Sequence, residues 1–135
     1  MENFFLPDSD ASELDRLMNG TSSMIIRGSQ EKPVLYRNLK KGDNLCLTRD
    51  NQYGETEALG FVSNILISGR LSREESFEII IRNQDKLQLP DDQFYRWAGN
   101  PYLVLIEIDN VRTVSLNLTE ADQHLPFLIP KPETK

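Results

Sequence analysis

Residues 102–116 read YLVLIEIDNVRTVSL, and the architecture of the chain follows from how this run must be covered. Its first half is almost continuously apolar, and its many β-branched residues favour an extended strand over a helix. A strand that is apolar on both faces is stable only where other elements cover both sides. We therefore predict that this segment is a central strand of a sheet.

Two helices are predicted just before this strand. Residues 71–89, LSREESFEIIIRNQDKLQL, contain Ser72 and Glu75 at the spacing of a capping box, which marks the start of a helix. The residues expected on its buried face are Phe77, Ile80, Ile81 and Leu87. Residues 89–99, LPDDQFYRWAG, start afresh after Pro90 and indicate a second, short helix.

Earlier in the chain, three more strands are predicted, at residues 22–28, 44–48 and 55–69. The last of them, ETEALGFVSNILISG, is long and is expected to bend at Gly60, because glycine inside a strand commonly marks a bulge. The pattern Leu14, Leu17 and Met18 predicts a short amphipathic helix over residues 10–19.

About four strands, with helices at the start and before the last strand, do not alternate as βαβ units do. This order favours an α+β fold with a small β-barrel or a strongly curved mixed sheet and flanking helices. The length of 135 residues predicts a single domain over residues 1–135, with its core at about 24–114 and a proline-containing C-terminal tail.

Composition excludes several classes of protein. The apolar fraction of 39% and charged fraction of 27% are ordinary for a globular protein, and the N-terminus has neither the basic start nor the apolar length of a signal peptide. We expect a cytoplasmic monomer with no membrane segment. One cysteine, Cys46, and one histidine, His124, make a Cys/His metal site improbable, and no nucleotide-cradling glycine motif is present, so no metal or cofactor is expected.

Charge is unevenly distributed along the chain. The net charge is −6, but residues 27–49 hold six basic residues against two acidic ones, a net of +4, which leaves −10 for the rest. Two interpretations fit this segment: a solvated basic loop on an acidic protein, or one localised site for an anion.

Several segments together resemble the ASCH domain family of the PUA-like superfamily, and one bacterial branch of it in particular. They are MIIRG (24–28), LKKGD (39–43), EESFEIIIRNQDKLQL (74–89) and FYRWAGNPYLVLIEIDNV (94–111). The resemblance extends from about Met24 to Val114. It implies a barrel of about five or six strands with a cleft for RNA or nucleotide-like ligands; some members of the family are acetylcytidine amidohydrolases and others ribonucleases.

The catalytic members of that family carry a K-x-x-T-x-R pattern, in which the lysine is a base and the threonine the nucleophile, with a glutamate elsewhere. Residues 32–37, KPVLYR, keep Lys32 and Arg37 at this spacing but have Leu35 in place of the threonine. A leucine side chain has no lone pair and cannot form an acyl intermediate. Thr48 is a stand-in only if the loop brings it to the site.

Other residues are candidates from their chemistry. Glu107 interrupts the apolar strand, so it either faces water at a strand end or pairs with Lys32, Arg37 or Arg27 in a cleft. Tyr36, Trp97 and Tyr102 are aromatic residues of the kind on which RNA bases stack, while core packing is the alternative for Trp97.

Three functional hypotheses remain open. The first is a binding domain for RNA, a nucleotide or a modified base, in a basic cleft. Its expected ligand-binding residues are Arg27, Lys32, Tyr36, Arg37, Trp97 and Tyr102. The second is a hydrolase of a small nucleoside-like amide that uses Lys32, Glu107 and an activated water. The third is a protein-interaction module whose acidic surface meets a basic partner.

Overall fold

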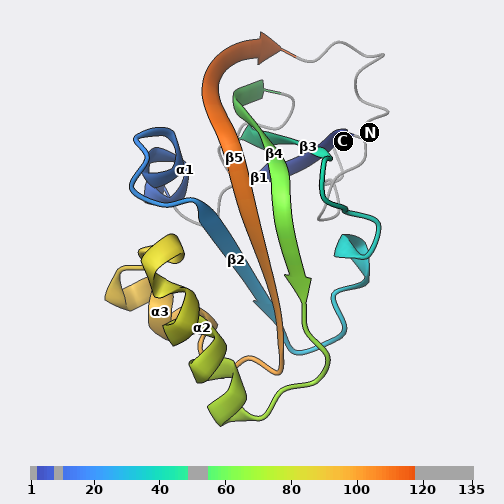
Figure 1. Cartoon of the computed structure of the whole chain (residues 1–135), viewed down its shortest axis with the longest axis vertical. Coiled ribbons are helices and arrows are strands. Elements are labelled where there is room, and N and C mark those ends of the chain that lie inside the picture. The colour runs from blue at the N-terminus through green and yellow to red at the C-terminus, as the bar shows by residue number, and fades with distance from the viewer. Residues whose placement is uncertain (1–2, 8–10, 49–54, 118–135) are drawn as a thin grey trace, which may run out of the picture.

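A five-stranded sheet in the order β1-β3-β4-β5-β2 organises the residues that the computed structural model describes, namely 3–7, 11–48 and 55–117. Its strands are β1 (Asn3–Pro7), β2 (Met24–Ser29), β3 (Asn44–Thr48), β4 (Glu55–Ile67) and β5 (Tyr102–Asn117). β1 runs parallel to β3, and the other neighbouring pairs are antiparallel. β4 and β5 are long and bent (Figure 1). The predicted α+β fold with a curved mixed sheet is confirmed.

The strand β5 lies between β4 and β2, as the apolar run at its start predicts. Its side chains alternate between the two faces of the sheet. Val104 and Ile106 belong to one core cluster, whereas Leu103 and Leu105 belong to another. Both faces of this strand are therefore covered, which explains its continuous hydrophobicity.

The strand β1 was not among the four predicted from the sequence. It is short, and of its described side chains Phe4 and Leu6 are buried. They lie opposite Leu45 and Leu47 of β3 in the parallel register. Long-range pairing with β3, which no local pattern reveals, stabilises this strand.

The predicted bend at Gly60 is confirmed. The register of β4 against β5 shifts between Leu59 and Phe61, and Asn110 on the opposite strand adopts a left-handed φ of 54°. A Cβ atom on Gly60 would lie 2.5 Å from Cγ2 of Ile108. Glycine is needed here because the backbone of β4 approaches the side chains of β5 too closely for any other residue.

The helices are α1 (Ala11–Met18), α2 (Arg73–Leu87) and α3 (Asp91–Trp97), with a short 3-10 helix, η1 (Val34–Tyr36). The capping box is confirmed, because the Glu75 amide donates to Ser72 Oγ (3.1 Å) and the Ser72 amide donates to Glu75 Oε1 (2.8 Å). Ile80 and Leu87 are buried as predicted, but Ile81 is 61% exposed. The prediction for Ile81 was wrong because the buried face of α2 includes fewer positions than the run of apolar residues in its sequence.

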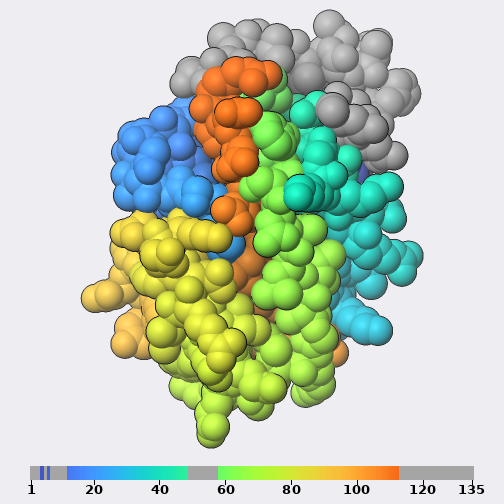
Figure 2. All heavy atoms as spheres, viewed as in Figure 1, coloured from blue at the N-terminus to red at the C-terminus, as the bar shows by residue number. Residues whose placement is uncertain are grey.

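Two core clusters cover the two faces of the sheet. On what we call the α1 face, Leu14 and Leu17 of α1 pack with Ile25 of β2 and Ile106 of β5. On what we call the α2 face, helices α2 and α3 pack against β2 and β5 through a second cluster. Figure 2 shows α2 beside β4, whose side chains reach the surface there. The predicted C-terminal tail, His124 and residue 10 lie outside the described residues.

Candidate functional site

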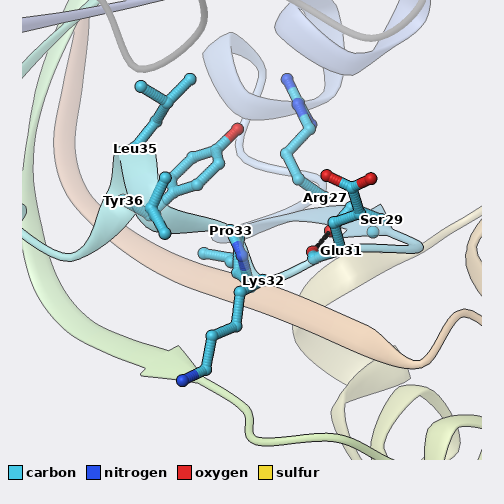
Figure 3. Close-up of a pocket in the computed structure, with 10 residues that line it drawn as sticks. Arg27, Ser29, Glu31, Lys32, Pro33, Leu35 and Tyr36 are labelled. Atoms are coloured by element: carbon cyan, nitrogen blue, oxygen red, sulfur yellow. Dashed lines mark hydrogen bonds between the residues drawn. The ribbon is translucent and has the colours of Figure 1, made fainter.

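A pocket of about 370 Å³ lies on the α1 face, between β2 and the segment that follows it (Figure 3). Its lining comes from Arg27, Gly28 and Ser29 of β2, residues 31–36, and Val104 of β5. Small-molecule sites commonly measure about 300–1,000 Å³ and combine apolar walls with a few polar groups. This pocket has both the size and the composition of such a site.

The turn η1 builds one wall of the pocket. Pro33 precedes the turn with its φ at −82°, and the Tyr36 amide donates to the Pro33 carbonyl (3.2 Å). The tight turn directs Tyr36 into the core, where 6% of it is exposed, while Val34 and Leu35 remain more than 40% exposed. An apolar rim and a buried aromatic ring therefore come from three consecutive residues.

The charged side chains stand at opposite ends of the pocket. Figure 3 shows Arg27 pointing from β2 toward α1, and Lys32 extending the other way. The Tyr36 hydroxyl points toward Arg27. A bound molecule would therefore meet a phenol and a guanidinium at one end and an ammonium group at the other.

The guanidinium of Arg27 is held by Glu13 of α1. Arg27 Nη1 lies 2.8 Å from Glu13 Oε2, and Nη2 lies 2.8 Å from Oε1. The side chains of this pair are only 12% and 5% exposed. Nη1 also donates to the Ile26 carbonyl (2.7 Å). Such a bidentate pair fixes the orientation of the Arg27 side chain and compensates its charge.

The pKa of Tyr36 depends on its burial and, to a smaller extent, on the Arg27–Glu13 pair. Burial raises the pKa of Tyr36 above its ordinary value of 10.0; Arg27 lowers it and Glu13 raises it, each by less than burial does. The phenol is therefore protonated at neutral pH and can donate a hydrogen bond.

The predicted basic cleft is less basic than the sequence implied. Of its two cations, Arg27 is neutralised by Glu13, and only Lys32 is an exposed cation. Glu31 lies on the same lining. The walls contributed by Pro33, Val34 and Leu35 are apolar, so the pocket suits a largely uncharged group better than a polyanion.

The hydroxyl groups on the pocket lining belong to Ser29 and Tyr36. Leu35, where the sequence resemblance would place a threonine, lines the cavity with its apolar side chain. The Ser29 hydroxyl, also on the lining, donates to the Glu31 carbonyl. Thr48 is buried at the end of β3 and is not part of the lining.

Two predicted site residues lie elsewhere. Arg37 is exposed just after η1 and does not line the pocket. Glu107 projects on the α2 face, where its Oε1 lies 3.3 Å from Lys86 Nζ. Of the two alternatives stated for Glu107, pairing with Lys32, Arg37 or Arg27 is wrong, because strand alternation places Glu107 on the opposite side of the sheet.

The two other aromatic candidates also lie outside the lining. Trp97 is buried in the cluster of the α2 face, which confirms the core-packing alternative. Tyr102 pairs with Ser29 in the register of β2 and β5, two residues beyond the pair formed by Arg27 and Val104. Tyr102 is therefore next to the pocket without lining it.

Sequence reasoning missed Glu13. It was read only as the residue three positions after Asp10, a candidate N-cap, yet it precedes Leu17 by four residues and so shares the apolar face of α1. An acidic residue on the buried side of a helix requires a partner. That signal, together with the unexplained Arg27, could have predicted the pair.

Comparison with known proteins identifies the architecture. No protein-family model and no curated protein sequence matches this chain. The crystal structure of ASCH from Zymomonas mobilis superimposes with a TM-score of 0.58 at 10% identity, covering 86% of this chain and 72% of that one. The chain has an ASCH-like fold.

Two variants of the same Zymomonas protein are equally similar. A serine-to-alanine and a tyrosine-to-phenylalanine variant both match with a TM-score of 0.58 at 9% identity. Each covers 86% of this chain, and 72% and 74% of the respective variant is covered. At this identity the likeness concerns the ASCH-like fold alone.

Two searches of the described residues bear on other classes of function. None of their helices is long and apolar enough to pass through a membrane. Within the same ranges, three or more His, Cys, Asp or Glu side chains do not gather where they could hold a metal ion.

Proposed function

We propose that this chain is a binding domain that holds a nucleobase or nucleoside-like group, free or as part of a nucleotide or RNA segment, in the pocket between β2 and η1. The observation that carries the proposal is the composition of the lining: Pro33, Val34 and Leu35 form an apolar wall beside buried Tyr36. Bases are flat, largely apolar on their faces, and commonly recognised next to aromatic side chains.

The polar groups of the pocket suit the two ends of a nucleotide. The phenol of Tyr36 and the fixed Arg27–Glu13 pair stand at one end, where they can hydrogen-bond the edge of a base. Lys32 stands at the other end with an exposed ammonium group. A lysine in such a position can pair with a phosphate while the uncharged part of the ligand occupies the cavity.

Binding without hydrolysis is the activity that these residues support. Leu35 cannot act as a nucleophile. The alternative hydrolase needs Lys32 and Glu107 at one reacting centre, but these side chains lie on opposite faces of the sheet. The proposal also includes a single domain over residues 1–135, a cytoplasmic location and a monomeric state, as expected from the sequence.

The experiment is a calorimetric titration with adenosine 5′-monophosphate of the wild type, Lys32→Ala and Lys41→Ala. Lys41 is the matched control, an exposed lysine of the same basic segment that does not line the pocket. We expect Lys32→Ala to weaken binding about tenfold, since a charge-assisted contact contributes about 1.5 kcal/mol, and Lys41→Ala to bind like the wild type. Equal losses in both variants, or no binding to the wild type, would contradict the proposal.

A further inference from the structure

The end of the pocket nearest α1 contains the guanidinium of Arg27, whose charge is already compensated by Glu13. Both guanidinium nitrogens of Arg27 that face Glu13 are engaged at 2.8 Å by its two carboxylate oxygens. Nη1 has a further acceptor in the Ile26 carbonyl. An anion entering this end would have to displace a carboxylate that is 5% exposed.

The opposite end differs in this respect. Lys32 is exposed, and its side chain extends away from Arg27 (Figure 3). A phosphate carries its charge most favourably where an accessible cation compensates it. The pocket is thus electrically asymmetric, with the Arg27–Glu13 ion pair and the Glu31 carboxylate toward the α1 end and the accessible cation of Lys32 at the other.

We propose that Glu13 is a specificity-determining residue: by occupying Arg27, it makes the α1 end of the pocket select an uncharged polar group and reject a phosphate. This inference rests on the proposed nucleoside-binding function and deepens it. The ligand class is then a nucleoside or nucleotide that inserts its base toward α1 and leaves any phosphate at the Lys32 end.

The decisive variant is Glu13→Gln, which keeps the shape and one hydrogen-bond acceptor but removes the negative charge. Arg27 then lacks its buried carboxylate partner at the wall of a cavity, and a cation that has lost such a partner attracts an anion. We expect inorganic phosphate to bind Glu13→Gln at least tenfold more tightly than the wild type, in a calorimetric titration. The double variant Glu13→Gln with Arg27→Gln removes both charges, and its phosphate affinity should return to the wild-type value.

Phosphate is used as the probe so that this inference and the proposed function can fail separately. If folded Glu13→Gln, checked by circular dichroism, binds phosphate no better than the wild type, the role of Glu13 is refuted whether or not cytidine binds. If the wild type does not bind cytidine, the nucleoside-binding function is refuted. The comparison of phosphate affinities still shows whether Glu13 prevents Arg27 from binding phosphate.

A measurement on the wild type covers the case in which Glu13→Gln does not fold. The Nε–H signal of Arg27 in a nitrogen–proton correlation spectrum reports directly on this end of the pocket. We expect cytidine to shift that signal and inorganic phosphate to leave it unchanged. A shift with phosphate, competing with cytidine, would overturn the inference.

Discussion

Tyr36 belongs both to the hydrophobic core and to the proposed binding pocket. Its ring belongs to the core cluster of the α1 face, and its side chain also lines the pocket. Burial raises the pKa of Tyr36, so ionising this phenol is less favourable in the folded chain than in the unfolded one. Tyr36 therefore makes the free energy of unfolding fall as the pH becomes alkaline.

The sign of this dependence can be tested. Above about pH 10, tyrosine in the unfolded chain loses its proton while folded Tyr36 keeps it, so the free energy of unfolding falls as the pH rises. We expect Tyr36→Phe to show a shallower fall than the wild type in urea denaturation between about pH 9 and 11. Tyr95→Phe, which changes a tyrosine that is 71% exposed, is the matched control. Identical slopes for wild type and Tyr36→Phe would contradict the assignment.

Leu35 leads to a prediction about chemistry. A unit of base, nucleophile and oxyanion donors that lacks its nucleophile loses on the order of 10³-fold or more in rate. We expect purified protein incubated with acetylcytidine to release no cytidine above background, as measured by chromatography. Turnover that disappears in Lys32→Ala would refute the binding interpretation and indicate that water or another hydroxyl serves as the nucleophile.

At the scale of elements, the Arg27–Glu13 pair ties α1 to β2. Removing one partner of a buried ion pair typically costs about 3–5 kcal/mol, because the other charge is left without compensation. We expect Glu13→Ala to lower the free energy of unfolding by about 3 kcal/mol, measured by urea denaturation at pH 7. Glu13→Leu combined with Arg27→Met should recover most of this loss. A double variant as unstable as Glu13→Ala would show that the charge is not the cause.

The bend in β4 supplies a second test at this scale. Gly60→Ala would place a Cβ 2.5 Å from Ile108 Cγ2 and 3.3 Å from the Asp109 carbonyl, so strands β4 and β5 would have to move apart. We expect a loss of about 1–3 kcal/mol in the free energy of unfolding. Gly69→Ala is the control, since nothing lies within 4 Å of its added Cβ. Equal stability of the two variants would refute the close approach at Gly60.

Local signals predicted the elements better than their contacts. Ser72 with Glu75 and Pro90 marked the starts of α2 and α3, because caps act within one turn of helix. Arg27, Lys32 and Tyr36, which the sequence grouped because they lie close together along the chain, do line one pocket, whereas Arg37 next to them does not. Their binding of a ligand stays a prediction. For Glu107 the sequence left open whether it faces water or pairs with a cation of the basic segment, because only the strand register shows that it faces Lys86 of α2.

At the scale of the whole molecule, the sheet separates the packing of α2 and α3 on one face from the pocket on the other. Helices α2 and α3 cover one face and bury Trp97 with Leu103 and Leu105. The other face holds α1, η1 and the pocket. The proposed binding pocket thus lies on the α1 face, where a short loop after β2 can change its side chains without disturbing the packing of the helices on the α2 face.

Filling the cavity tests this arrangement. The measurement is the affinity for cytidine of the wild type, Leu35→Trp and Ile81→Trp, each determined by nitrogen–proton correlation spectra during titration. Leu35 lines the pocket, whereas Ile81 is an exposed apolar residue of α2 on the other face. The binding-domain proposal predicts shifts in Ser29, Val34 and Tyr36 on titration of the wild type and Ile81→Trp, and loss of binding in Leu35→Trp. Cytidine binding that survives in folded Leu35→Trp, or that shifts residues of α2 instead, would contradict it.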